Sequence, residues 1–211
     1  GFCSFGQVNH TCSAAKTRAY QRILKKTRAG SADNLLMERY DVHWYFLDLN
    51  VERDTTFLSG NVTIGANMLV ASDTFCFELN STMTIDSIIY LGNSIPFTHT
   101  NTTNICYAKP TTIIPANTNV NMKIYYHGDA SVVGGSAIGD GFSTDTSPTW
   151  GNSVTWSLSE PYSAREWFPC KQFLQDKADS VWVFVTTDDQ NKVGSNGVLQ
   201  GIDIVPGNKV R

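Results

Sequence analysis

The sequence predicts a mainly β protein, a large antiparallel or mixed β-sandwich or a curved open sheet, with one N-terminal α-helix. Short stretches of alternating apolar and polar residues recur about every ten residues, separated by Asn, Gly, Ser and Pro. Such spacing is typical of sandwiches and curved sheets rather than of βαβ units. No convincing amphipathic helix follows Ser31, and 41% hydrophobic residues in a chain of 211 suffice for a core.

The predicted helix spans residues 13–28, with Ser13 as its N-cap and Gly30 as its end. Its apolar face carries Ala15, Ala19, Tyr20, Ile23 and Leu24. We therefore divide the chain into a helical appendage, residues 1–31, and a β domain, residues 32–211.

Residues 40–52 and 58–69 predict the first two strands, because apolar residues recur at every second position. The alternation in the first strand changes phase near Phe46 and Leu47, which predicts a β-bulge there.

The later strands are expected at 74–79, 83–91, 94–98, 105–108, 119–126, 154–158, 181–186, 192–199 and 202–205. Of these, 181–186 and 192–199 are expected to pair as a hairpin. Residues 127–149 are rich in Gly, Ser, Asp and Thr and predict a long surface loop. A phosphate-binding loop is disfavoured, since no Gly-x-x-x-x-Gly-Lys-Ser pattern is present.

Composition argues against several classes of partner. A net charge of −3 with 17% charged residues argues against nucleic acid and anionic membranes. No apolar run reaches the roughly 20 residues of a transmembrane helix, and residues 1–7 do not resemble a cleavable signal peptide. Because the chain does not begin with Met, a mature or trimmed form is expected.

The five cysteines lack the close paired spacing of a zinc ribbon or a redox motif. We expect disulfides between Cys3 and Cys12 and between Cys76 and Cys106, with Cys170 as a buried free thiol. Disulfides, few charges and many Asn and Thr residues favour an extracytoplasmic protein, secreted or periplasmic. Four glycosylation sequons agree with that location and begin at Asn9, Asn61, Asn80 and Asn101.

Common catalytic patterns are missing from the sequence. None of its four histidines lies in a His-Glu-x-x-His pattern, and no Gly-x-Ser-x-Gly elbow occurs. A Cys170 nucleophile paired with His43 or His99 is disfavoured. Nothing selects a glycosidase pair among the nearby carboxylates Glu160, Glu166, Asp176 and Asp179.

The stretch 156–179 holds the most unusual chemistry. Pro161 and Pro169 place Glu160 on irregular backbone, where functional residues often lie. Arg165 is a candidate ion partner for Glu160. A solvated or structural ion pair between the two explains this spacing equally well.

Three motifs in the same order resemble the zinc aminopeptidases of the aminopeptidase N family. The first is Glu160-Pro161-x-x-Ala164-Arg165-x-x-x-Pro169-Cys170, followed by Asp-Lys-Ala-Asp at 176–179. The other two are the strand pattern of residues 40–64 and the run Lys-Val-Gly-Ser-Asn-Gly at 192–197. The resemblance covers roughly residues 33–203 and is to the N-terminal domain of that family.

The resemblance implies a saddle-shaped sheet that closes one side of a cleft. It also implies that zinc lies in a downstream catalytic domain, so this fragment holds no metal and is inactive alone. Glu160 would bind the α-amino group of a peptide substrate, supported by Arg165. Many relatives have Gln where this chain has Leu158, so the pocket for the first substrate side chain is expected to be more apolar. Lys171, Gln172 and Phe173 replace an acidic pair and a proline, a difference that concerns packing.

Two alternatives remain open. An all-β module can grip carbohydrate or a protein partner with exposed aromatic residues, here Trp44, Trp150, Trp156 or Trp167. A stand-alone scaffold that lost its catalytic half is the other.

Overall fold

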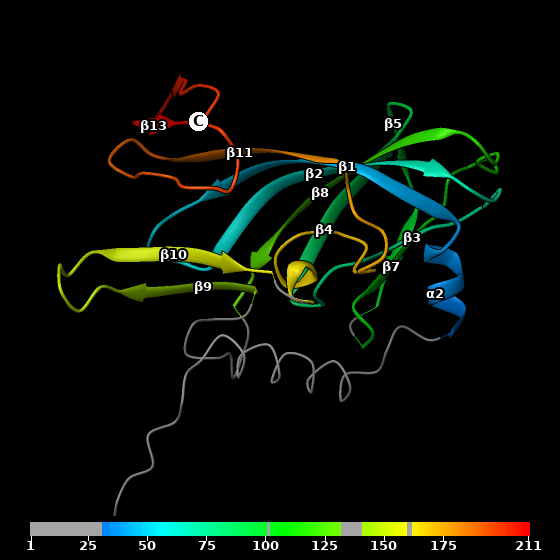
Figure 1. Cartoon of the computed structure of the whole chain (residues 1–211), viewed down its shortest axis with the longest axis horizontal. Helices are drawn as coiled ribbons and strands as arrows, with labels where there is room; N and C mark the ends of the chain where they lie inside the picture. Colours follow the sequence, from blue (N-terminus) through cyan, green and yellow to red (C-terminus); the bar gives the residue numbers. More distant parts are fainter. Residues whose placement is uncertain (1–30, 101, 132–140, 160–161) are drawn as a thin grey trace, which may run out of the picture.

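The computed structural model describes residues 31–100, 102–131, 141–159 and 162–211 and confirms the mainly β fold (Figure 1). Its helical elements are α2 (Ser31–Met37) and the 3-10 turn η1 (Ala164–Glu166). Its strands are β1 (Tyr40–Val51), β2 (Phe57–Met68), β3 (Phe75–Glu78), β4 (Met83–Tyr90), β5 (Asn93–Ile95), β6 (Phe97–His99), β7 (Ile105–Ala108), β8 (Asn119–Asp129), β9 (Gly141–Thr146), β10 (Ser153–Leu158), β11 (Ser180–Asp188), β12 (Ile204–Val205) and β13 (Lys209–Val210).

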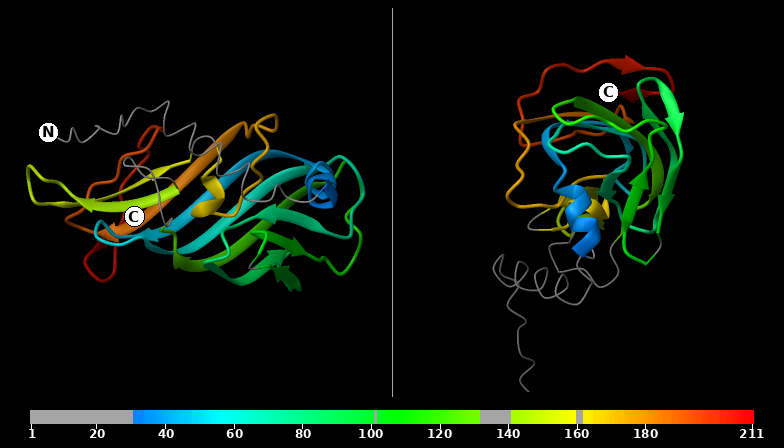
Figure 2. Two further views of the ribbon diagram at one scale, coloured as in Figure 1. Left: turned by 90° about the horizontal axis from the view of Figure 1, so that it is seen from below. Right: turned by 90° about the vertical axis from the view of Figure 1, so that its right-hand side faces the viewer.

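One large mixed sheet organises the domain. It has eight strands in the order β12-β13-β11-β1-β2-β8-β4-β5. β1 and β11 pair in parallel, and the other neighbours whose pairing is defined are antiparallel. A three-stranded sheet, β3-β7-β6, and the hairpin β9-β10 lie on one side of the large sheet together with η1 (Figures 1 and 2).

Alternation along the long strands produces the two faces of the sheet. In β8 the even-numbered residues from Val120 to Tyr126 are buried, whereas Asn119, Asn121 and Tyr125 are exposed. The inner face packs on Phe75 and Phe77 of β3. Each fully buried aromatic or aliphatic side chain contributes about 1.5–3 kcal/mol, so this layer is the main source of stability.

A register shift in β1 confirms the predicted β-bulge but places it earlier in the strand. The pairing with β2 slips between Val42 and Trp44, so the bulge lies at His43 rather than near Phe46. Trp44 and Phe46 therefore face away from the core, on the side opposite to Leu47. The sequence pattern alone had placed Val42, Trp44 and Phe46 on one face.

One helical prediction lies outside the described residues, and another is wrong. The predicted helix at residues 13–28 and the appendage at 1–31 lie outside the described residues, apart from Ser31. The expectation of no helix after Ser31 is wrong, because α2 forms there with Asp33 in its first turn. α2 has only seven residues, too few to show a clear amphipathic period. In the described part of the chain, no helix has the length and apolar character that crossing a membrane requires.

Two predicted strands, 94–98 and 192–199, and one predicted loop, 127–149, need correction. The expected strand at 94–98 is two strands, β5 and β6, separated by Pro96, which has no N–H for a ladder. The expected loop at 127–149 holds the end of β8 and the whole of β9.

The expected hairpin partner of β11, residues 192–199, forms no strand. β13 instead pairs with the end of β11, at Thr187 and Asp188, and the Asn191 side chain just beyond donates to Glu52 and to Thr187 at 3.1 and 2.8 Å.

Glu52 fastens the C-terminal hairpin β12-β13 to the sheet. One of its carboxylate oxygens accepts from Thr187 and Asn191, and the other pairs with Lys209 at 2.5 Å. Burial acts to raise the pKa of Glu52, but the hydrogen bonds from Lys209 and Asp188 outweigh it and lower the pKa below its ordinary value of 4.5.

We predict that Glu52→Gln lowers the urea midpoint at pH 7, because the ion pair with Lys209 is lost. A lowered folded-state pKa stabilises the protein above 4.5, and this contribution disappears as the pH falls through the folded value. The difference between variant and unchanged protein should therefore shrink below about pH 4.5. A difference that is constant from pH 7 to pH 3 would contradict the assignment.

Candidate functional site

Ser159 and the segment 162–172 form the described part of the candidate functional site, and short backbone hydrogen bonds fix the course of these residues. The Ser163 N–H donates to the Ser159 carbonyl at 2.9 Å, and the Trp167 and Phe168 N–H groups both donate to the Ala164 carbonyl at 3.1 Å. Pro169 cannot continue the turn of η1.

Cys170 then pairs with β3, because its N–H and carbonyl exchange hydrogen bonds with Glu78 at 2.9 and 2.8 Å. The segment is thereby held on the small sheet.

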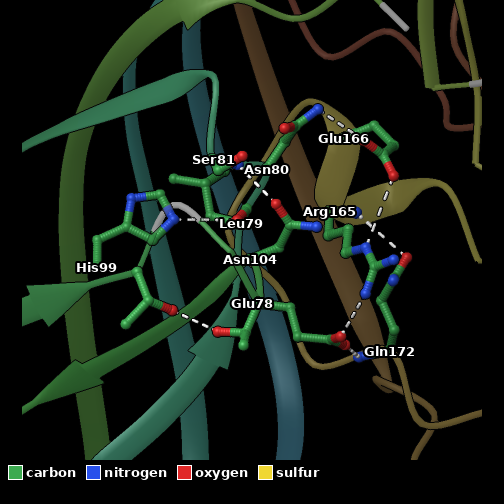
Figure 3. Close-up of polar contacts among 11 residues, drawn as sticks. Glu78, Leu79, Asn80, Ser81, His99, Asn104, Arg165, Glu166 and Gln172 are labelled. Atoms are coloured by element: carbon green, nitrogen blue, oxygen red, sulfur yellow. Dashed lines mark hydrogen bonds and ion pairs between the residues drawn. The ribbon is translucent and has the colours of Figure 1, made fainter. Parts of the chain in front are cut away.

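A buried ion network lies beneath this segment (Figure 3). Arg165 Nη1 donates to Glu78 Oε1 at 2.8 Å, with both side chains less than 10% exposed. Arg165 Nε lies 3.6 Å from Glu166 Oε1, and Asn80 Nδ2 donates to Glu166 Oε2 at 2.6 Å. Gln172 completes the network, since its N–H donates to Glu78 Oε2 at 3.3 Å and its side-chain oxygen accepts from the Arg165 N–H at 3.2 Å.

The network joins this segment to Glu78 of β3 and to Asn80 just after it, both more than 80 positions away in the chain. Removing charges from water costs several kcal/mol per ion, which only good geometry and further hydrogen bonds offset. Arg165 is therefore a structural anchor whose described ion partners are Glu78 and Glu166.

The structure describes two of the three site residues predicted from the sequence, Arg165 and Leu158. Glu160 lies outside the described residues, so its expected pairing with Arg165 stays a prediction. Its neighbour Ser159 accepts a hydrogen bond from Trp167 Nε1 at 3.1 Å. Leu158 is the last residue of β10, half-buried and paired with Gly141.

An apolar groove of about 800 Å³ opens beside Ser159. The inner faces of β1 and β11 form one wall, the hairpin β9-β10 the other, and residues 190–196 lie at its edge. Its lining includes Leu47, Val183, Phe142, Trp156 and Trp167. Such a groove can bury an apolar side chain or an extended segment of chain.

Aromatic stacking connects the segment to the sheet. The Trp167 ring lies 4.6 Å from Phe168 and 5.8 Å from Phe142, and Phe168 meets Tyr45 edge-on at 5.8 Å. Tyr126 also donates to the Trp167 carbonyl at 3.0 Å. These contacts make the groove wall and the segment one packed unit.

The described thiols are unsuited to catalysis. Burial raises the pKa of Cys170 well above its ordinary value, and the nearby Glu78 charge adds to this. The prediction of a buried free thiol at Cys170 is confirmed.

The predicted disulfide between Cys76 and Cys106 is wrong, because both cysteines are free. Cys76 lies opposite Tyr107 and Cys106 lies opposite Phe77, so their side chains point to opposite faces of the β3-β7 pair. Burial raises the pKa of Cys76 to about 12. Cys3 and Cys12 lie outside the described residues.

The three described histidines, His43, His99 and His127, each contact a different residue. His43 pairs with Asp179 at 3.1 Å, and His127 pairs with Asp86 at 3.0 Å. His99 contacts the Leu79 carbonyl at 3.0 Å, and desolvation lowers its pKa. Among the described residues, no group of three or more His, Cys, Asp or Glu residues can hold a metal ion.

In two of the predicted glycosylation sequons, the Asn side chain is buried in the fold. Asn80 donates to Glu166 and accepts from the Thr82 N–H at 3.1 Å, and Asn61 is only 8% exposed. Neither amide is presented to solvent in the folded domain. The sequons at Asn9 and Asn101 lie outside the described residues.

No protein-family model and no curated protein matches the chain in sequence. Solved structures of M1 zinc metallopeptidases share its fold. That of the enzyme from Deinococcus radiodurans has a TM-score of 0.70 and 21% identity, over 81% of this chain and 38% of the enzyme. A variant of that enzyme bound to a Tyr-Ser-Ala substrate gives 0.70 and 22%, and a two-domain M1 enzyme bound to L-arginine gives 0.70 and 21%, with the same coverage. The chain thus has the fold of somewhat more than a third of these enzymes.

We predict that Arg165→Ala lowers the free energy of unfolding by about 3–5 kcal/mol, because Glu78 would remain buried without its cation. Urea denaturation followed by tryptophan fluorescence measures this. Exposed Arg53 is the matched control, and Arg53→Ala should change stability by less than about 0.5 kcal/mol. The double variant Arg165→Met with Glu78→Leu should recover much of the loss. Equal stability of Arg165→Ala and Arg53→Ala would show that the pair is not an anchor.

Proposed function

We propose that this chain is the N-terminal β domain of a zinc metallo-aminopeptidase, which removes N-terminal residues from peptides. The observation that carries the proposal is the shared fold with M1 zinc metallopeptidases over 81% of the chain. The ordered motifs at residues 40–64, 160–170 and 192–197 also support it.

Glu160 is proposed as the anchor of the substrate α-amino group. A carboxylate in a cleft with little water binds an ammonium group by charge-assisted hydrogen bonds of about 1.5–3 kcal/mol. The described neighbours are held in place, since Ser159 accepts from Trp167 Nε1 and from the Ser163 N–H, and the Arg165 N–H donates to Gln172.

Leu158 and the groove bear on the first substrate side chain. Leu158 is two residues before Glu160 and half-buried at the end of β10, where many relatives carry Gln. An apolar residue there favours an apolar first side chain, by about 0.8 kcal/mol for each buried methylene group. Arg165 holds the segment in position through its ion pair with Glu78 and does not itself bind the substrate.

Zinc would be held by another part of a longer chain, because the described residues offer no set of metal ligands. The proposed partners are therefore the peptide N-terminus and a downstream catalytic domain of the same polypeptide. An extracytoplasmic location stays a prediction that now rests on low charge and high Asn and Thr content, since the Cys76–Cys106 disulfide is absent.

We predict that Glu160→Ala in the longer enzyme lowers kcat/KM for an alanyl anilide substrate by about ten- to a hundredfold, the scale of one charge-assisted contact. The matched control is Glu38→Ala, at an exposed position after α2, which should leave kcat/KM unchanged. Equal kinetics for both variants would remove Glu160 from the site. A longer chain without peptidase activity would overturn the proposed function itself.

A further inference from the structure

Four aromatic side chains gather on the outer face of the large sheet, opposite the core. Trp44 and Phe46 project from β1 and Trp182 and Phe184 from β11, and Phe46 lies opposite Trp182 in the parallel register. We call these four residues the outer aromatic surface. The small sheet, η1 and the hairpin β9-β10 lie on the other side of the large sheet (Figure 1), so none of these elements covers this surface.

Gly65 of β2 shapes the floor of this surface. A Cβ atom at Gly65 would lie 2.1–2.5 Å from atoms of the Trp44 indole, so that indole rests directly on the β2 backbone. Any larger residue at position 65 would displace it.

Trp182 forms a wall beside this floor. Its ring lies 5.7 Å from that of Trp44 at an interplanar angle of 74°, and the residue is 50% exposed. The two rings make a corner open to solvent, with one aromatic face on each side.

The rim of the surface is polar and its charges are largely satisfied. Thr63 of β2 and Asn121 of β8 stand in the same rows of the sheet as Phe46 and Trp44. Arg211 binds both carboxylate oxygens of Asp48, at 3.2 and 2.9 Å, and stacks on Phe184 with its guanidinium carbon 4.5 Å from the ring centre. The hydroxyl of Thr63 and the amide of Asn121 thus flank the aromatic rings. The charged groups on this face have other partners, since Asp48 is paired with Arg211 and Lys123, in the row of Phe46 and Thr63, lies 4.9 Å from the centre of the Tyr125 ring.

We propose that the outer aromatic surface binds a neutral oligosaccharide of β-1,4-linked pyranose rings. Such rings present flat faces of C–H groups to aromatic rings and hydroxyl groups to amides, and they carry no charge. A protein partner is less well matched, because a stable protein interface buries about 800 Å² on each side, whereas of these four side chains only Trp182 is strongly exposed. The proposal does not depend on the proposed peptidase function.

The test is isothermal titration calorimetry of this chain with cellohexaose, chitohexaose and mannohexaose. At least one hexasaccharide should bind, and Trp182→Ala should weaken that binding by at least about tenfold. Trp150→Ala is the matched control, because Trp150 is 79% exposed but lies between β9 and β10, away from this surface. It should bind as the unchanged chain does.

A second variant tests the floor separately. Gly65→Ala should also weaken binding, since its Cβ displaces the Trp44 indole, and circular dichroism confirms that the variant is folded. The proposal is overturned if none of the three sugars binds at millimolar concentration, or if Trp182→Ala and Trp150→Ala bind equally. Self-association of the chain that Trp182→Ala abolishes would instead make this surface an interface between copies and would also overturn it.

Discussion

The arrangement of the candidate site depends on one buried ion pair, between Arg165 and Glu78. Glu78 holds the segment 162–172 twice, by its side chain on Arg165 and by its backbone on Cys170. A charge pair at this depth gains from further bonds to its remaining atoms. The Gln172 N–H supplies one, to Glu78 Oε2 at 3.3 Å, whereas Arg165 Nε makes no hydrogen bond within the described residues. Residues 162–172 are therefore tied to the small sheet through Glu78 and also to the large sheet, where Tyr45 and Tyr126 hydrogen-bond to them.

Local alternation was enough to predict most strands. β7 was predicted with its observed bounds, and β2 and β8 differ at their ends by only a few residues, because one face of each is buried and the other solvated. The failures came from distant contacts. Residues 192–199 carry a plausible strand pattern, yet Asn191 is bound by Glu52, which lies 139 positions earlier in the chain.

The candidate site could be predicted only in part. The pattern around Arg165 identified the right segment, whereas Glu78 and Asn80 carry no signal that links them to it across more than 80 residues. The cysteines show the same limit, since spacing cannot tell that Cys76 and Cys106 face opposite sides of one strand pair. Glu160 was singled out by resemblance, because a carboxylate beside a proline is by itself a common surface feature.

The bulge at His43 determines what each face of the large sheet presents. In a strand the side chains alternate with a period of two, so one extra residue exchanges the faces of everything beyond it. Beyond the bulge, Leu47 and Leu49 line the groove and the core, while Trp44 and Phe46 stand outside beside Trp182 and Phe184. Without the bulge the indole of Trp44 would point toward the groove and leave the backbone of Gly65 uncovered. The groove next to Ser159 and the outer aromatic surface are thus two results of one local irregularity in β1.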